Sequence, residues 1–182
     1  MSPSDRPHQR KWERIISAFM TGDLDNLRIL QRTGSRGRIL EVLVQRCFDT
    51  LGISYEREPI FAHVPPSAWY ADFAARHELK LVSDHRYNPD YVLADGTWVE
   101  VTLSENTAFK KLFRYGHQAP RLLVLWLDPD VGLHKQICED VKFPNATINP
   151  ISSYWQRLEA TAHGAEVVRK LKALRELKHK IM

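Results

Sequence analysis

The stretch that decides the fold covers residues 88–102 and reads N-P-D-Y-V-L-A-D-G-T-W-V-E-V-T. Its two apolar segments, 91–94 and 98–103, are rich in valine, tyrosine, tryptophan and threonine, which suit a pleated, half-buried surface. The Asp-Gly pair between them is a strong signal for a hairpin turn. We therefore expect two antiparallel strands, with one carboxylate at Asp90 and another at Glu100.

The length of the hairpin loop decides whether these two carboxylates share a face of the sheet. A two-residue loop would place Asp90 opposite Val101 and turn Glu100 to the other face. A three-residue loop over 95–97, with its glycine at positive φ, would place Asp90 opposite Thr102. Because alternate residues of a strand point the same way, Asp90, Glu100 and Thr102 would then share one face. We prefer the longer loop, since it gives each carboxylate a companion.

Helices and strands alternate around the hairpin. Apolar spacing and the boundary Gly and Pro residues predict a helix at 35–51, a strand at 53–64 broken at Pro59, a helix at 104–116, a buried strand at 121–127, a helix at 131–141 and an edge strand at 146–149. A strand–helix–strand crossover places the strand at 121–127 parallel to that at 98–103. Residues 67–87, with helix formers at 68–81, form an insertion that either shapes a substrate cleft or covers the core.

Further helices flank this core, which we place at 35–150. The segment 1–34 is expected to form an N-terminal helical arm with two short helices before residue 31. The segment 151–182 is expected to form a long basic amphipathic helix packed on the core, with Gly164 as a point of interruption. The apolar side of such a helix can pack on the domain, and the helix can also contact nucleic acid, a membrane surface or a second copy in a homodimer.

Composition narrows the class of protein. The chain has 182 residues, of which 43% are hydrophobic and 26% charged, as in a globular protein with one domain and small additions. Its net charge of +4 permits binding to a polyanion without requiring it. No apolar run is long enough to span a membrane, and the N-terminus lacks the apolar core of a signal peptide, so we expect a cytoplasmic protein without a membrane partner. Cys47 and Cys138 are expected to be small core residues, not a disulfide or a metal pair.

The hairpin also carries a resemblance to a known family. Pro89-Asp90 followed by Glu100-Val101-Thr102 resembles the signature of the PD-(D/E)xK nucleases, the restriction-endonuclease-like superfamily, with Thr102 where the signature has lysine. The resemblance extends over about residues 35–127 and implies an α/β fold with a mixed central sheet of αβββαβ order. In this family the helix before the first strand often carries an acidic residue that faces the metal. Glu41 matches that placement, and an exposed helix glutamate is the alternative.

The resemblance implies a metal-dependent endonuclease that hydrolyses phosphodiester bonds of nucleic acid, with DNA preferred over RNA. Clustered carboxylates without His or Cys suit a hard cation such as Mg²⁺ or Mn²⁺. Asp90 and Glu100 would be its ligands together with the carbonyl of Val101, and Glu41 would hold a second metal or an ordered water. The metal would lower the pKa of a bound water and offset charge on the scissile phosphate.

Thr102 is the departure from the family pattern, because threonine can donate a hydrogen bond but carries no charge. In one interpretation the lysine's role passes to Lys110 or Lys111 on the next helix, and we favour Lys111. Viral cap-snatching endonucleases resemble this arrangement. In the other, the chain is a catalytically degenerate nuclease-like fold that binds nucleic acid or protein without cutting it.

Overall fold

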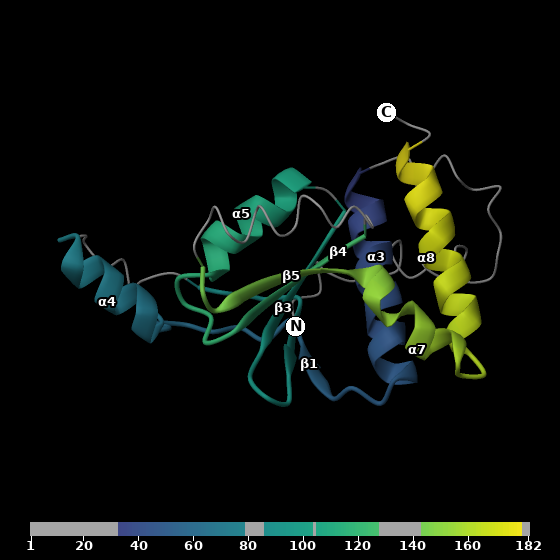
Figure 1. The fold of residues 1–182 in the computed structure, drawn as a ribbon, viewed down its shortest axis with the longest axis horizontal. Coiled ribbons are helices and arrows are strands. Elements are labelled where there is room, and N and C mark those ends of the chain that lie inside the picture. Colours follow the sequence, from purple (N-terminus) through teal and green to yellow (C-terminus); the bar gives the residue numbers. More distant parts are fainter. Residues whose placement is uncertain (1–32, 79–85, 104, 128–142, 180–182) are drawn as a thin grey trace, which may run out of the picture.

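A five-stranded mixed sheet carries the hairpin at its centre (Figure 1). In this computed structural model, residues 33–78, 86–103, 105–127 and 143–179 are described. The helices and strands are α3 (Thr33–Thr50), β1 (Tyr55–Arg57), α4 (Ala68–Arg76), β2 (Tyr91–Leu93), β3 (Trp98–Thr102), α5 (Glu105–Tyr115), β4 (Leu122–Trp126), β5 (Ala146–Pro150), the 3₁₀ helix η3 (Ile151–Tyr154), α7 (Trp155–Glu159) and α8 (Gly164–His179). The helices expected before residue 31 and at 131–141, together with Cys138, lie outside the described residues.

The strand order is β1-β2-β3-β4-β5, and the chain is α/β as the sequence predicts. β1, β2 and β3 pair antiparallel, whereas β3, β4 and β5 pair parallel. The crossover through α5 makes β4 parallel to β3, because a strand–helix–strand connection returns in the same direction. β5 extends the parallel half of the sheet at its edge.

The first strand is much shorter than the predicted 53–64. The ladder between β1 and β2 ends at Arg57, after which Glu58 adopts a positive φ of 48°. The next residue, Pro59, has no N–H to donate to a ladder. Antiparallel pairing returns only as an isolated bridge between Phe61 and Tyr87.

The hairpin register differs from both predicted registers. Tyr91 lies opposite Val99, so the three-residue loop covers 94–96, one residue earlier than expected, and the predicted pairing of Asp90 with Thr102 is wrong. The carboxylate of Asp95 accepts a hydrogen bond from the N–H of Thr97 at 3.0 Å, which closes the turn before that residue. The loop glycine has the predicted positive φ, at 81°. Because the register moves by two residues, the faces of the strand are unchanged.

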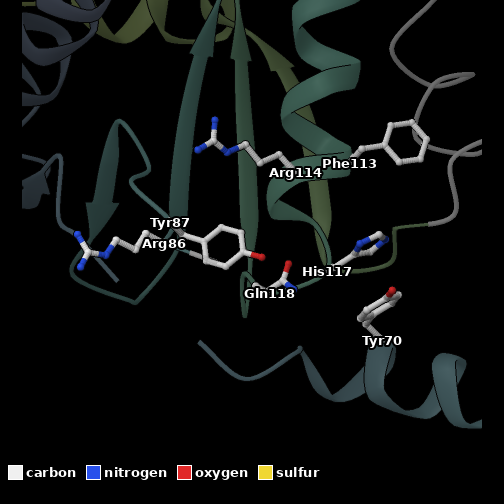
Figure 2. A pocket seen from close by; sticks show the side chains of 7 residues that line it. All are labelled: Tyr70, Arg86, Tyr87, Phe113, Arg114, His117 and Gln118. Atoms are coloured by element: carbon white, nitrogen blue, oxygen red, sulfur yellow. The ribbon is translucent and has the colours of Figure 1, made fainter. Parts of the chain in front are cut away.

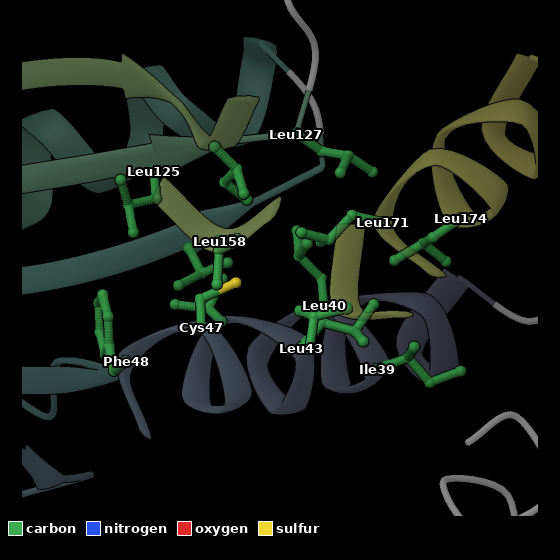
Figure 3. Close-up of a cluster of buried hydrophobic side chains, with 14 of the residues drawn as sticks. Ile39, Leu40, Leu43, Cys47, Phe48, Leu125, Leu127, Leu158, Leu171 and Leu174 are labelled. Carbon is green, nitrogen blue, oxygen red and sulfur yellow. The ribbon is translucent and has the colours of Figure 1, made fainter. Parts of the chain in front are cut away.

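Each face of the sheet is covered by a different set of helices. On one face, α3, α7 and α8 pack over Val99 and Leu125 of the sheet. α3 and α8 lie side by side, and Figure 3 shows their leucines meeting those of the sheet. Cys47 lies in this core, and burial raises the pKa of its thiol to about 12. On the other face, α5 packs over Trp98 and Val124.

The C-terminal segment is a broken helix. A turn at 160–163 separates α7 from α8, and the hydroxyl of Thr161 accepts the N–H of Gly164 at 3.0 Å. Val168, Leu171 and Leu174 of α8 are buried in the core with α3, so this apolar side is used within the chain. Lys170, one of the basic residues of this helix, is only 4% exposed and pairs with Glu166 at 3.4 Å. No helix in the described ranges has the length and apolarity needed to cross a membrane.

Two glycines give a matched test of this packing. In Gly37→Ala the new methyl meets nothing within 4 Å inside α3, so we expect stabilisation by about 0.5–1 kcal/mol. In Gly164→Ala the methyl collides with the backbone carbonyl of Leu158, so we expect a loss of roughly 1–3 kcal/mol. Urea unfolding followed by circular dichroism measures both, and equal effects in the two variants would contradict the packing of α8.

Candidate active site

Three oxygen atoms converge on the ammonium group of Lys111. Its Nζ lies 3.0 Å from Oδ2 of Asp90, 2.6 Å from Oε2 of Glu100 and 2.8 Å from the carbonyl oxygen of Val101. Asp90 lies just before β2, Glu100 lies in the middle of β3, and the lysine comes from α5. The structure therefore brings together the hairpin acids and one of the two candidate lysines.

Backbone hydrogen bonding explains why the cluster forms at this point. The N–H of Leu93 bonds the carbonyl of Thr97, so the alternation of an antiparallel ladder would make Pro89 the partner of Val101. Proline has no N–H to offer, and β2 begins only at Tyr91. The N–H of Val101 bonds Oδ2 of Asp90 at 2.7 Å instead, and its carbonyl accepts a hydrogen bond from Lys111. Side chains thus replace the missing strand at Val101.

The packing of α5 selects Lys111 over Lys110. Ala108, Leu112 and Tyr115 are buried against the sheet and fix the rotation of the helix. Lys111 then lies at the edge of the buried face, where its side chain reaches the carboxylates, whereas Lys110 is exposed. Burial lowers the pKa of Lys111, but Glu100 and Asp90 outweigh burial, so its pKa is raised and it is cationic at neutral pH.

Glu100 is the most buried member of the cluster, with 2% of its side chain exposed. Burial raises its pKa to about 7, against the opposing effect of Lys111, and the charge of Asp90 adds to the rise. One of its oxygens also accepts the N–H of Asp90 at 3.3 Å. Burial therefore disfavours the charged form of Glu100 more than the ion pair with Lys111 favours it.

Glu41 approaches the cluster from the other side of the sheet. Its side chain is 20% exposed and bonds Arg38 at 2.5 Å, and Arg38 also bonds Glu58. The hydroxyl of Tyr91 donates to the main-chain oxygen of Glu41 at 2.6 Å, which fixes α3 against β2. Burial and then the charge of Asp90 raise the pKa of Glu41. The structure places Glu41 beside the cluster, not in it. The alternative prediction of an exposed helix glutamate does not fit either, because only 20% of its side chain is exposed.

Thr102 occupies the last position of β3 and is buried. Its carbonyl accepts the N–H of Leu127 at 3.1 Å, which continues the parallel pairing with β4. The positive charge near Glu100 comes from Lys111 on α5 and not from this strand. That Lys111 takes over the role of the family's lysine stays a prediction.

Tyr115 and Arg38 were not expected at the site. The hydroxyl of Tyr115 donates to the main-chain oxygen of Asn88 at 3.1 Å, and burial and then the charge of Glu100 raise its pKa. Tyr115 lies four residues after Lys111, and residues at that spacing share a helix face. Arg38 lies three residues before Glu41, which is also a same-face spacing. Their helical spacing from Lys111 and Glu41 could therefore have identified Tyr115 and Arg38 from the sequence.

The donor set fits a hard cation by its chemistry. Asp90, Glu100 and the Val101 carbonyl offer only oxygen, and all three lie within 3.0 Å of one point, the Nζ position of Lys111. Among the described residues, no group of three or more His, Cys, Asp or Glu side chains is arranged to hold a metal. Two carboxylates are nevertheless the usual protein contribution to a Mg²⁺ site, where water and substrate phosphate complete the coordination.

Comparison with known proteins does not assign this chain to a family. Separate searches of protein-family models, curated proteins and solved structures found no match to this chain. The resemblance to PD-(D/E)xK nucleases therefore depends on the hairpin residues and on the cluster that they form.

The raised pKa of Glu100 predicts how stability depends on pH without metal. The folded protein holds this proton up to about pH 7, whereas the unfolded chain releases it near 4.5. The unfolding free energy should therefore fall as pH rises from about 4.5 to 7, by roughly 2–4 kcal/mol. Glu100→Gln should lack this part of the decline. Urea unfolding across that range, with chelator present, tests it, and parallel curves for the two proteins would contradict the assignment.

Proposed function

We propose that this protein is a metal-dependent endonuclease that hydrolyses phosphodiester bonds of nucleic acid, with DNA preferred over RNA. The observation that carries the proposal is the convergence of Asp90, Glu100 and the Val101 carbonyl on one cation position, which the ammonium group of Lys111 occupies. The order of helix, hairpin, crossover helix and parallel strand supports it as well. It is the order that the αβββαβ nuclease core would have.

The three oxygens of this cluster would hold Mg²⁺ or Mn²⁺. Such an ion, when bound, lowers the pKa of a bound water and offsets negative charge on the phosphate. Lys111 now occupies the shared position, so it must give way, and its four-carbon stem lets the ammonium group move while α5 stays in place. A displaced Lys111 would pair with a phosphate oxygen and stabilise charge that develops during the reaction.

Glu41 is the residue best placed to handle the attacking water. It lies at the edge of the cluster, keeps part of its surface in solvent, and has a raised pKa that favours accepting a proton. In hydrolysis the water oxygen forms a bond to phosphorus while the ester P–O bond breaks. The water's proton passes to Glu41, and solvent protonates the leaving oxygen. Arg38 holds the Glu41 carboxylate in position.

One observation favours a second function. Lys111 already neutralises part of the carboxylate charge and satisfies the Val101 carbonyl, so the cluster is complete as an internal ion pair. A nuclease-like fold that binds nucleic acid or protein without cutting it would need nothing more. The two functions differ in whether a divalent ion enters the cluster.

Cleavage assays separate the two lysines. Single- and double-stranded DNA and RNA are incubated with Mg²⁺ or Mn²⁺, and with chelator as the blank. We expect Lys111→Ala to lower the cleavage rate by about 10²–10³-fold, because removing one group that stabilises the transition state commonly costs that much. Lys110→Ala is the matched control and should cut at the wild-type rate, since its side chain is exposed. Equal rates for both variants would remove Lys111 from the mechanism.

Metal titration by calorimetry tests the cation position directly. Wild type should bind Mn²⁺, and Glu100→Gln should bind it more weakly because a ligand oxygen loses its charge. Lys111→Met should bind Mn²⁺ more tightly than wild type, since the competing ammonium group is gone. If neither wild type nor Lys111→Met takes up Mn²⁺, the internal ion pair is the whole function of the cluster and the binding module replaces the enzyme.

A further inference from the structure

A hollow with a volume of about 500 Å³ lies at the C-terminal end of α5. Its walls come from α4, from the two residues before Asn88, and from α5 with the turn that follows it (Figure 2). Segments far apart in the sequence thus meet around one cavity. The volume falls within the range of pockets that hold small ligands.

Aromatic rings form much of the wall. Tyr70 and His117 are stacked, with ring centroids 4.0 Å apart and planes 10° apart. Burial lowers the pKa of His117, so its ring is neutral at physiological pH. Trp69 and Phe143 also pack against His117, with ring centroids 6.0 and 5.1 Å from its own. Figure 2 shows the ring of Tyr87 pointing toward His117 across the hollow.

The charged residues of the lining are both positive. Arg86 and Arg114 border the hollow, and none of its seven lining residues is acidic. Gln118 adds a buried amide, which can pair with the edge of a base. Flat rings, arginines and an amide are together the chemistry that binds an unpaired nucleotide. The rings stack on any base, and the arginines pair with phosphate.

Tyr115 joins the hollow to the carboxylate cluster. Its ring centroid lies 6.0 Å from that of Tyr87, which lines the hollow, and its hydroxyl bonds the main-chain oxygen of Asn88. On the cluster side, Tyr115 lies one helical turn after Lys111 on α5, and Lys111 bonds Glu100. Tyr115 therefore lies between a residue that lines the hollow and the lysine of the cluster. A strand whose phosphate lies at the cluster would bring a neighbouring base to the hollow.

We propose that this hollow binds an unpaired base of a nucleic-acid strand, next to the phosphate held at the cluster. The inference deepens the proposed nuclease function and depends on it for the role of the neighbouring phosphate. It assigns single-stranded or locally unpaired nucleic acid as the substrate class, because a base inside an intact duplex cannot enter a pocket.

Binding of short single-stranded DNA containing 2-aminopurine tests the pocket without requiring cleavage. Wild-type protein, with chelator or with Ca²⁺, should quench the fluorescence of the stacked base. His117→Ala should lose this quenching and bind the strand about 10-fold more weakly. Arg114→Gln should lower the slope of log affinity against log salt by about 0.7. Arg114 is exposed, so its variant keeps the test valid if His117→Ala is poorly folded.

Matched controls lie away from the hollow. His163→Ala and Arg157→Gln remove exposed residues of the same types and should behave as wild type. Binding to a fully paired blunt duplex should be the same for His117→Ala and wild type. The inference is overturned if wild type does not quench the probe, if the pocket variants bind single strands as wild type does, or if they lose duplex binding equally.

The two proposals can fail separately. If the pocket variants lose single-strand binding while wild type cuts nothing with Mg²⁺ or Mn²⁺, the pocket stands and the nuclease proposal falls. If wild type cuts, and the pocket variants cut single strands at the same rate, the nuclease proposal stands and the pocket falls.

Discussion

The site depends on one backbone constraint, the missing N–H of Pro89. Because proline cannot donate to a ladder, the carbonyl of Val101 has no N–H partner at Pro89, and β2 begins only at Tyr91. Buried backbone groups must nevertheless be hydrogen-bonded. Asp90 accepts from the N–H and Lys111 donates to the carbonyl. An acid and a base are thereby drawn to the same residue, and Glu100 on the neighbouring position of β3 completes the ion pair.

Charge balance decides what the cluster can attract. Asp90 and Glu100 carry two negative charges when ionised and Lys111 one positive charge, so the cluster keeps a net charge of −1. A divalent ion gains about twice the Coulomb energy of an ammonium group at equal distance, but it must first shed water. The ammonium group of Lys111, in contrast, is part of the chain and is held at the carboxylates by α5. Without it, the buried Glu100 would be an unpaired charge, which is strongly destabilising. Lys111 therefore stabilises the ionised form of Glu100, which would otherwise keep its proton, at the position that the proposed metal would take.

The alternation of side chains along a strand made one part of the site predictable from the sequence, whereas the rest depended on tertiary packing. Asp90 and Glu100 share a face because alternate residues of a strand point the same way. The predicted register was wrong by two residues, and a shift of two leaves each side chain on its face. The register itself depended on the Asp95 carboxylate, which closes the turn before Thr97, and turn propensity does not reveal that choice. The choice between Lys110 and Lys111 depended on how α5 rotates against the sheet. The hollow had only a partial sequence signal, the alternative in which the insertion at 67–87 shapes a cleft, because its other lining residues come from a separate segment.

The rigidity of α5 links the two halves of the proposed site. This one helix carries Lys111 at the carboxylates, Arg114 at the rim of the hollow and Tyr115 between them, and His117 follows its end. Buried contacts of Ala108 and Leu112 with the sheet fix its rotation. A base that entered the hollow would press against the C-terminal end of α5, whereas a phosphate or metal would act on Lys111 more than one turn earlier. Because the Lys111 side chain can move while α5 stays in place, the helix would keep the spacing between the cluster and the hollow fixed when either is occupied.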